Sequence, residues 1–165
     1  MSGMTLRVGD PAPPFSALSD QGQQISLDAL HGKWVVLFFY PRAGSRGCSV
    51  EARGFENLLH DFHRLGTDII GISTDTEAHQ AKFRQGCTLH FPLIPDSDKK
   101  ICSRYGVMGL LGLLTGQADR QTFLIDREGK IAHHWRFVNP FSHASEVLEQ
   151  VQGLTGYTET RESQS

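Results

Sequence analysis

A run of seven apolar residues, from Trp34 to Tyr40, constrains the possible folds more than any other feature of this sequence. The run is rich in aromatic and β-branched residues, and Pro41 ends it. A strand with one face in water alternates between apolar and polar residues, whereas an unbroken run predicts a strand buried on both faces. We therefore expect a central strand in a sheet that is covered on both sides.

A helical pattern follows the loop at 42–47. It begins near Cys48 and ends at Gly66, a residue type that commonly terminates helices. Its apolar positions recur at the spacing of one helix face: Cys48, Ala52, Phe55, Leu58, Leu59, Phe62 and Leu65. Cys48 is therefore expected in the first turn of a helix that leaves the end of the central strand.

The rest of the chain alternates between strand and helix patterns and closes with a hairpin before the last helix. Strands are expected at 68–74, 91–94, 122–126 and 130–137, and helices at 77–85, 98–105 and 145–154. This order predicts an α/β protein with a central mixed sheet flanked by helices. With 165 residues the chain suits one domain, which we expect to span 1–154, followed by a disordered polar tail at 155–165.

Cys48 has the surroundings of a reactive thiol. The thiolate is the nucleophilic form, and the free N–H groups and dipole of a helix N-terminus stabilise an anion. Ser45 lies three residues earlier, where its hydroxyl can reach the sulfur or a substrate oxygen, and Gly44 and Gly47 allow close backbone approach. One exposed helix end stabilises an anion only modestly, so a cation from elsewhere in the chain is expected nearby. The simpler alternative is a buried structural thiol.

Pro41, Ser45 and Cys48 reproduce the Pro-x-x-x-Thr/Ser-x-x-Cys motif of the peroxiredoxins. The chain resembles their Q subfamily, also called bacterioferritin comigratory proteins, and the similarity extends from 8–10 to the last helix. It is carried by several motifs in order: Phe39-Tyr40-Pro41, Gly47-Cys48-Ser49, Glu51-Ala52, Gly71-Ile72-Ser73-Thr74-Asp75, Phe91-Pro92-Leu93, Tyr105-Gly106-Val107, Arg120-Gln121-Thr122-Phe123-Leu124-Ile125-Asp126 and Trp135-Arg136.

The resemblance implies a thioredoxin-like fold and the reduction of hydrogen peroxide or organic hydroperoxides by a thiol, with no cofactor and no metal. It makes Cys48 the peroxidatic nucleophile, which becomes a sulfenic acid. It also implies that Ser45 hydrogen-bonds the substrate, that Arg120 contacts both thiolate and peroxide, and that Pro41 shields the pocket. Arg120 would then supply the expected cation. One departure is Arg46, which stands where the Q-type pattern usually has proline.

The sequence does not decide which residue resolves the sulfenic acid. Many Q-type proteins carry a resolving cysteine five residues after the peroxidatic one, where this chain has Arg53. Others carry it in the helix that runs to residue 85 here, at a position that aligns with Arg84. Cys87 follows about one helical turn later and is the candidate resolving cysteine, with thioredoxin or a similar dithiol as its reductant. If Cys87 is instead an ordinary thiol, an external thiol must reduce Cys48 directly.

Other groups of residues carry weaker functional signals. Cys102, beside Ile101 on a short helix, is expected to pack in the core. His60 and His63 lie three apart on a helix, but without a third ligand a solvated face is the simpler interpretation. The leucine-rich segment 110–114 is most simply local core; alternatively it is an exposed patch that binds a partner, a second copy or lipid peroxides. That patch keeps open a second function class, a redox sensor or chaperone-like binder with little turnover.

Composition and charge exclude several function classes. The chain has 16 Lys and Arg against 18 Asp and Glu, and this near-balance argues against binding to nucleic acid or an anionic membrane. No apolar run approaches the ~20 residues of a membrane span, and the first residues lack the apolar region of a signal peptide, so a cytoplasmic location is expected. Three cysteines without a CxxC motif argue against a thioredoxin-type disulfide reductase and a zinc ribbon. The resemblance favours a monomer over a homodimer.

Overall fold

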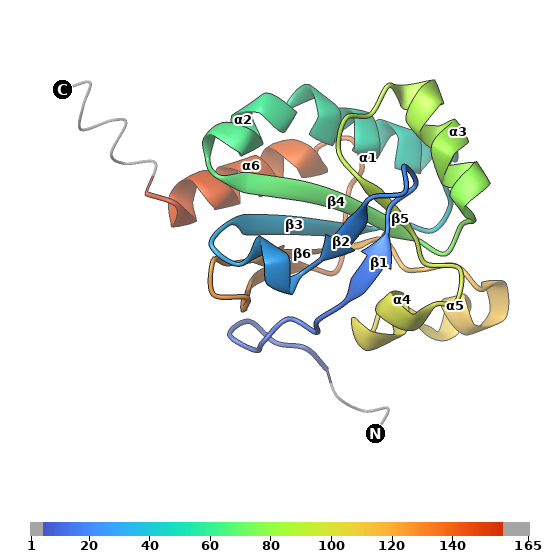
Figure 1. The fold of residues 1–165 in the computed structure, drawn as a ribbon, viewed down its shortest axis with the longest axis horizontal. Helices are drawn as coiled ribbons and strands as arrows, with labels where there is room; N and C mark the ends of the chain where they lie inside the picture. The colour runs from blue at the N-terminus through green and yellow to red at the C-terminus, as the bar shows by residue number, and fades with distance from the viewer. Residues whose placement is uncertain (1–4, 157–165) are drawn as a thin grey trace.

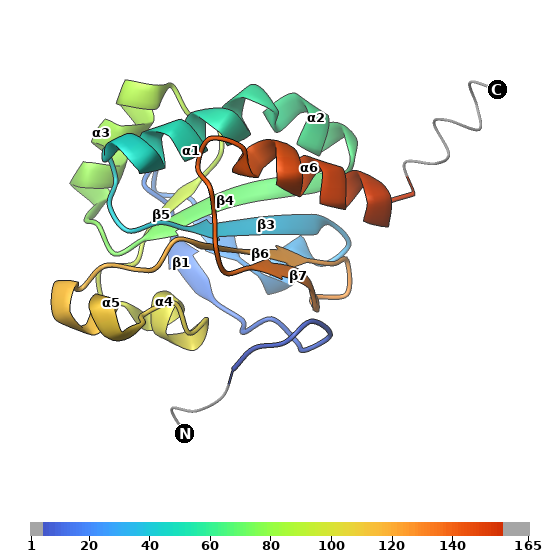
Figure 2. The same ribbon diagram turned by 180° about the vertical axis from the view of Figure 1, so that it is seen from behind.

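The structure, a computed structural model, describes residues 5–156, with the side chain of residue 111 excepted. Figure 1 shows a central sheet with helices on both faces, and Figure 2 shows the same layers from behind. The predicted α/β class with a central mixed sheet is confirmed. Most of the predicted tail, 157–165, lies outside the described residues, whereas Thr155 and Gly156 form a turn after the last helix.

Five strands form the central sheet: β3 (Trp34–Phe39), β4 (Thr67–Ser73), β5 (Leu93–Pro95), β6 (Gln121–Ile125) and β7 (Ile131–Trp135). Their order across the sheet is β5-β4-β3-β6-β7. All six residues of β3 are buried, as its unbroken apolar run predicts. β4 runs parallel to β3 and β6 runs antiparallel to it, which makes the sheet mixed.

Helices cover both faces of this sheet (Figures 1 and 2). One face carries α1 (Arg46–Asn57), α2 (Leu59–Arg64), α3 (Glu77–Cys87) and α6 (His143–Leu154). The other face carries α4 (Lys100–Arg104) and α5 (Leu110–Thr115), which are both short. The hairpin of β1 (Ser16–Leu18) and β2 (Gln24–Ser26) and the 3-10 turn η1 (Asp28–Leu30) precede the central strand.

Strand pairing brings distant segments to one edge of the sheet. Phe39, at the end of β3, pairs with Ile72 near the end of β4 and with Gln121 at the start of β6. Because β4 is parallel and β6 antiparallel to β3, the loops after β3 and β4 meet the segment that precedes β6. α1 begins at this same edge, so residues from all these segments can contribute to one site.

Some element boundaries differ from the expected ones. The helix predicted to run unbroken to Leu65 forms as α1 and α2, because the backbone of Leu58 leaves the helical region (φ −105°, ψ 6°). β5 includes Pro95, one residue beyond the strand expected at 91–94. β5 pairs only with β4, and an edge strand tolerates proline because one of its sides needs no N–H donor.

The leucine-rich segment is not core, so the simplest interpretation of it was wrong. α5 leaves the side chains of Leu110, Leu113 and Leu114 exposed by 81, 75 and 80%. A six-residue helix with leucines on several sides cannot turn all of them toward the sheet. Gly112 packs inward instead, since a Cβ there would lie 2.7 Å from a backbone carbonyl oxygen. Cys102, in contrast, is fully buried in the core, as expected.

Two further features bear on the excluded function classes. Within residues 5–156, no helix has the length and apolar character that crossing a bilayer requires. In the same part of the chain, no three His, Cys, Asp or Glu side chains gather closely enough to hold a metal ion. The helical pair His60 and His63 therefore has no third ligand among these residues.

Candidate active site

Cys48 lies in the first turn of α1, as the helical pattern predicts. Ser45 caps this helix: its backbone is extended (φ −68°, ψ 157°), and its hydroxyl oxygen accepts the N–H of Cys48 at 3.4 Å. The Cys48 side chain is fully buried against the core beneath α1. Arg46 is exposed at the start of the helix. The sulfur therefore faces the protein interior, while the arginine that follows the cap faces water.

Arg120 reaches the thiol from the segment that precedes β6. Its Nη1 donates to Glu51 Oε1 at 2.8 Å, which places the guanidinium beside the first turns of α1, where Cys48 lies. Burial by itself lowers the pKa of Arg120, but the nearby Cys48 and Glu51 outweigh burial and raise it. A Cβ at Gly47 would lie only 3.0 Å from Arg120 Nη2, so glycine leaves room for the guanidinium beside the helix. The expected cation is thus present at the thiol.

Glu51 is an ionisable residue of this site that we did not single out from the sequence. It follows Cys48 by three residues on α1, so the two side chains share one helix face. Its side chain is fully buried, and Oε2 has no hydrogen-bond partner among the described residues. Burial raises the pKa of Glu51 to about 7, although Arg120 acts to lower it. The sequence feature that could have identified Glu51 was its position one helical turn after Cys48.

A buried chain of hydrogen bonds holds the loop before Cys48, and the sequence did not reveal it. Tyr40 Oη donates to Gln80 Oε1 at 2.5 Å, and Gln80 Nε2 donates to Ser73 Oγ at 2.8 Å. Ser73 Oγ donates to Asp75 Oδ2 at 2.6 Å, and Asp75 Oδ2 also accepts the N–H of Ala43 at 2.7 Å. Burial raises the pKa of Tyr40 well above its ordinary value, so the phenol keeps its proton and donates. Side chains of β4, of the loop that follows it and of α3 therefore hold the loop before Cys48 in position.

Cys87 is the last residue of α3 and is half-buried. It lies in the wall of a cavity of about 990 Å³ between α3, the first turns of α1 and the loop that follows β3. Pro41, half-buried, and Ser45 line the same cavity. The candidate resolving cysteine therefore faces the same space as the loop that precedes Cys48.

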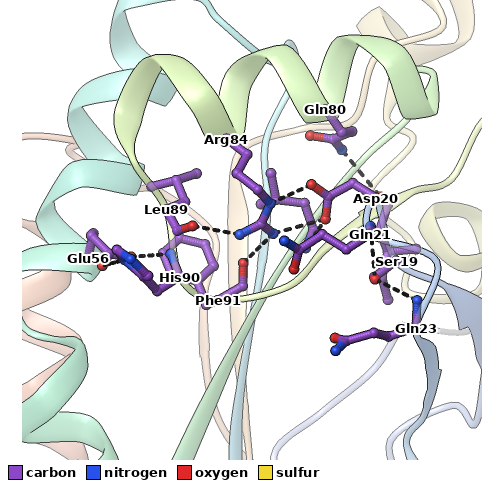
Figure 3. Close-up of polar contacts among 12 residues, drawn as sticks. Ser19, Asp20, Gln21, Gln23, Glu56, Gln80, Arg84, Leu89, His90 and Phe91 are labelled. Carbon is purple, nitrogen blue, oxygen red and sulfur yellow. Dashed lines mark hydrogen bonds and ion pairs between the residues drawn. The ribbon is translucent and has the colours of Figure 1, made fainter.

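Arg84 has a structural role in α3 (Figure 3). Its Nε and Nη2 atoms pair with the Asp20 carboxylate at 2.6 and 2.9 Å, and the Asp20 side chain is fully buried. Nη1 donates to the carbonyl of Leu89 at 2.6 Å, and Nη2 to that of Phe91 at 2.7 Å. Arg84 thus ties α3 to the turn between β1 and β2 and to the segment that leads into β5. The arginine at the position where the resemblance places a resolving cysteine therefore makes structural contacts here.

A cysteine in a first helical turn, a serine cap and an arginine beside that turn form a candidate thiol-based site on an α/β scaffold. The model of the AhpC/TSA family matches residues 8–134 of this chain. The chain belongs to this family, as a peroxiredoxin of the Bcp/PrxQ subfamily. It is a thiol peroxidase, and its fold is the thioredoxin-like one of the peroxiredoxin structures.

Individual relatives agree over most of the chain. The putative peroxiredoxin bcp of Coxiella burnetii is 40% identical over 149 residues, which cover 88% of this chain and 98% of the relative. Peroxiredoxin Bcp of Escherichia coli K12 is 35% identical over 146 residues, covering 87% and 94%. Peroxidoxin BcpB of Mycobacterium tuberculosis superposes with a TM-score of 0.80 at 31% identity, covering 90% of this chain and 97% of that structure. A bacterioferritin comigratory protein of Xanthomonas campestris, described for its alkyl peroxide reduction activity, gives 0.80 at 30% identity, covering 91% and 98%.

Proposed function

We propose that the chain reduces hydrogen peroxide and organic hydroperoxides with the Cys48 thiolate as the attacking group. The observation that carries this proposal is the position of the Arg120 guanidinium beside the first turn of α1, where Nη1 donates to Glu51 Oε1 at 2.8 Å and a Cβ at Gly47 would lie 3.0 Å from Nη2. A guanidinium stabilises the thiolate and offers further N–H donors to the oxygen on which negative charge develops. The alkyl peroxide reduction described for the Xanthomonas relative supports the same substrate class.

The first step is the transfer of one oxygen to sulfur. The thiolate attacks the terminal oxygen of the peroxide, an S–O bond forms and the O–O bond breaks. The transferred oxygen keeps its hydrogen, so Cys48 becomes a sulfenic acid. The other oxygen leaves with the negative charge, takes a proton from solvent and departs as water or an alcohol. Ser45 and Arg120 are the groups that bind the peroxide oxygens, and Pro41 shields the pocket.

We further propose that Cys87 resolves the sulfenic acid. The Cys87 thiol attacks the Cys48 sulfur, a disulfide forms and water leaves. The partial exposure of Cys87 and its place in the cavity beside Ser45 support this role. Because Cys48 is buried, the first turn of α1 must unwind before the two sulfurs meet, and the long 3.4 Å cap bond to Ser45 resists unwinding only weakly. A dithiol such as thioredoxin then reduces the disulfide.

The intact mass of the reduced protein after one equivalent of hydrogen peroxide tests the resolving step. The wild-type protein is expected to lose ~2 Da and to yield a linked Cys48–Cys87 peptide pair. Cys87→Ser is expected to gain ~16 Da at Cys48 instead. A wild-type protein that gains ~16 Da with no link would overturn the resolving role of Cys87.

Replacement of the nucleophile tests the first step. Cys48→Ser is expected to lower peroxidase activity at least ~10³-fold, because no thiolate remains to attack the peroxide. Cys102→Ala is the matched control, since this thiol is buried in the core on the other face of the sheet. Retained activity in Cys48→Ser would overturn the mechanism.

A further inference from the structure

His143 is a buried histidine that the proposed peroxide step does not use. It is the first residue of α6, which lies beside α1 on one face of the sheet (Figure 2). Its Nε2 atom shares a hydrogen bond of 2.8 Å with the hydroxyl oxygen of Thr122, the second residue of β6, and Thr122 is buried as well. This bond therefore ties the start of α6 to the start of β6, two residues after Arg120.

Rings from a helix and a strand hold the imidazole in place. Phe55 of α1 and Trp135 of β7 both meet it edge to face, with ring centroids 5.7 and 5.6 Å away. Edge-to-face packing and hydrogen bonds both depend on orientation, so together they favour one placement of the ring. Burial lowers the pKa of His143 to about 4, and the positive charge of Arg120 acts in the same direction. The ring is therefore neutral near pH 7 and adds no second positive charge to this region.

Two contacts, one after the other, join α1 to the start of β6. Glu51 and Phe55 lie four residues apart on α1, so they share one side of the helix. Arg120 and Thr122 lie two residues apart, the spacing at which side chains of a strand share one face. In the first contact Arg120 Nη1 donates to Glu51 Oε1 at 2.8 Å. In the second, His143 links Thr122 to Phe55.

These two contacts are matched in spacing. α1 and β6 both begin at the edge of the sheet where β3 ends. From that edge, four residues of a helix rise about 6 Å and two residues of a strand about 6.7 Å. The contact at His143 therefore lies next to the one at Arg120, and a shift of β6 against α1 at either contact is felt at the other.

The start of α6 also packs closely against α1. A Cβ at Gly54 would lie 3.2 Å from the Cβ of Ala144, so a glycine on α1 lets α6 approach. A Cβ at Gly47 would lie 3.9 Å from Pro140 Cγ as well as 3.0 Å from Arg120 Nη2. The segment that leads into α6 and the guanidinium therefore meet at the first turn of α1.

We propose that His143 is a positioning residue for peroxide reduction: through Thr122 and Phe55 it fixes the start of β6 against α1 and so holds the Arg120 guanidinium beside the first turn of that helix. The inference rests on the proposed role of Arg120 in the oxidation of Cys48. In this role His143 does not need to touch the peroxide or the sulfur, because it acts through Arg120.

A second histidine provides a matched control. His134 of β7 also hydrogen-bonds a side chain of β6, since its Nε2 lies 2.7 Å from Gln121 Oε1. Its ring stacks on Phe123, which belongs to the core on the opposite face of the sheet from α1. Loss of this second hydrogen bond removes a similar contact from β6 but leaves the packing of β6 against α1 in place.

Single-turnover oxidation of Cys48 by peroxide near pH 7 measures the effect. His143→Phe keeps an aromatic ring but loses the hydrogen bond, and we expect the second-order rate to fall about tenfold as the guanidinium loses its fixed place. Thr122→Val removes the same bond from its other partner and should lower the rate by a similar factor. His143→Gln, whose amide can bond the threonine hydroxyl, should recover most of the rate. His134→Phe should keep a rate close to that of the wild type.

A double-mutant cycle separates positioning from a general loss of stability. If His143 acts through Arg120, His143→Phe should slow oxidation in the wild-type background but have almost no further effect on the rate in Arg120→Lys, where the forked donors are gone. The loss of unfolding free energy that His143→Phe causes, measured with urea, should be similar in both backgrounds. Rate losses that simply add would show a structural role alone and overturn the proposal.

The remaining outcomes separate this inference from the proposed function. Wild-type rates in folded His143→Phe and Thr122→Val would overturn the positioning role, while a slow Arg120→Lys still supported the proposed function. A wild-type rate in Arg120→Lys would overturn the role of Arg120 itself, and the positioning inference with it. If His143→Phe does not fold, Thr122→Val carries the same test, because valine matches threonine in shape. A rate loss in His134→Phe as large as that in His143→Phe would also contradict the proposal.

Discussion

Two arginine–carboxylate pairs in this protein share their chemistry but differ in how completely they are bonded. The carboxylates of Asp20 and Glu51 are both fully buried. Arg84 holds Asp20 through two bonds of 2.6 and 2.9 Å and donates two more to backbone carbonyls. Arg120 donates to Glu51 at 2.8 Å, and Glu51 Oε2 has no partner in the described part of the chain.

This difference separates an arginine that holds the fold from one that we propose serves the chemistry. A guanidinium has five N–H donors, and Arg84 spends four of them on groups that join three segments of the chain. Arg120 donates to Glu51 through Nη1. Under the proposed mechanism its other N–H groups serve the Cys48 thiolate and a bound peroxide oxygen.

Breaking the Arg84 pair is expected to have the largest effect. Arg84→Met leaves the buried Asp20 carboxylate without its counter-charge, which costs about 3 to 5 kcal/mol of the free energy of unfolding. Urea unfolding measures this loss. The rate of Cys48 oxidation by peroxide in the folded variant should stay close to that of the wild type. Adding Asp20→Asn should recover part of the stability, because no buried charge remains; an unchanged free energy of unfolding in Arg84→Met would contradict the structural role.

The conservative change at Arg120 is expected to affect chemistry instead. Arg120→Lys keeps the positive charge but loses the forked donors, and we expect the second-order rate of Cys48 oxidation to fall about 100-fold. Single-turnover oxidation by peroxide, followed by intact mass, measures this rate. Arg84→Lys is the matched control, which should lower stability and spare the rate. Equal rate losses in both variants would show that the two arginines do not differ in role.

The pH dependence of stability is expected to show the smallest effect. Burial holds the folded-state pKa of Glu51 at about 7, above its ordinary value of 4.5. Between these values the folded state keeps a proton that the unfolded state has released. The stability that this proton contributes is complete below pH 4.5 and is lost as the pH rises through 7.

Glu51→Gln removes this titration and isolates its contribution. Relative to the variant, the wild type should lose about 1 to 2 kcal/mol of unfolding free energy between pH 5.5 and 7. Burial lowers the pKa of His134 and of His143 to about 4, so these groups also titrate in acid, but they are present in both proteins and cancel in the comparison. Urea unfolding of both proteins at the two pH values measures this difference in unfolding free energy. Identical pH profiles for the wild type and the variant would refute the raised pKa of Glu51.

The sequence by itself determined the local frame of the site. The unbroken apolar run from Trp34 predicted the buried central strand, and helical spacing placed Cys48 in the first turn of α1. Ser45 caps that turn from three residues away. These features depend on backbone preferences and face periodicity over a few residues, which a single sequence displays directly. The resemblance to a known family added Arg120, whose guanidinium lies beside the first turn of α1 in the structure.

Tertiary structure alone decided which groups meet across the chain. The sequence positions of Arg84 and Asp20 do not predict that they pair. No local pattern predicts that Glu51 pairs with Arg120. Leu110, Leu113 and Leu114 of α5 were expected in the core but are exposed, because burial depends on what a helix packs against rather than on its composition. The partners of buried charges follow from strand order and helix packing. Those contacts join residues far apart in the chain, and no local pattern records them.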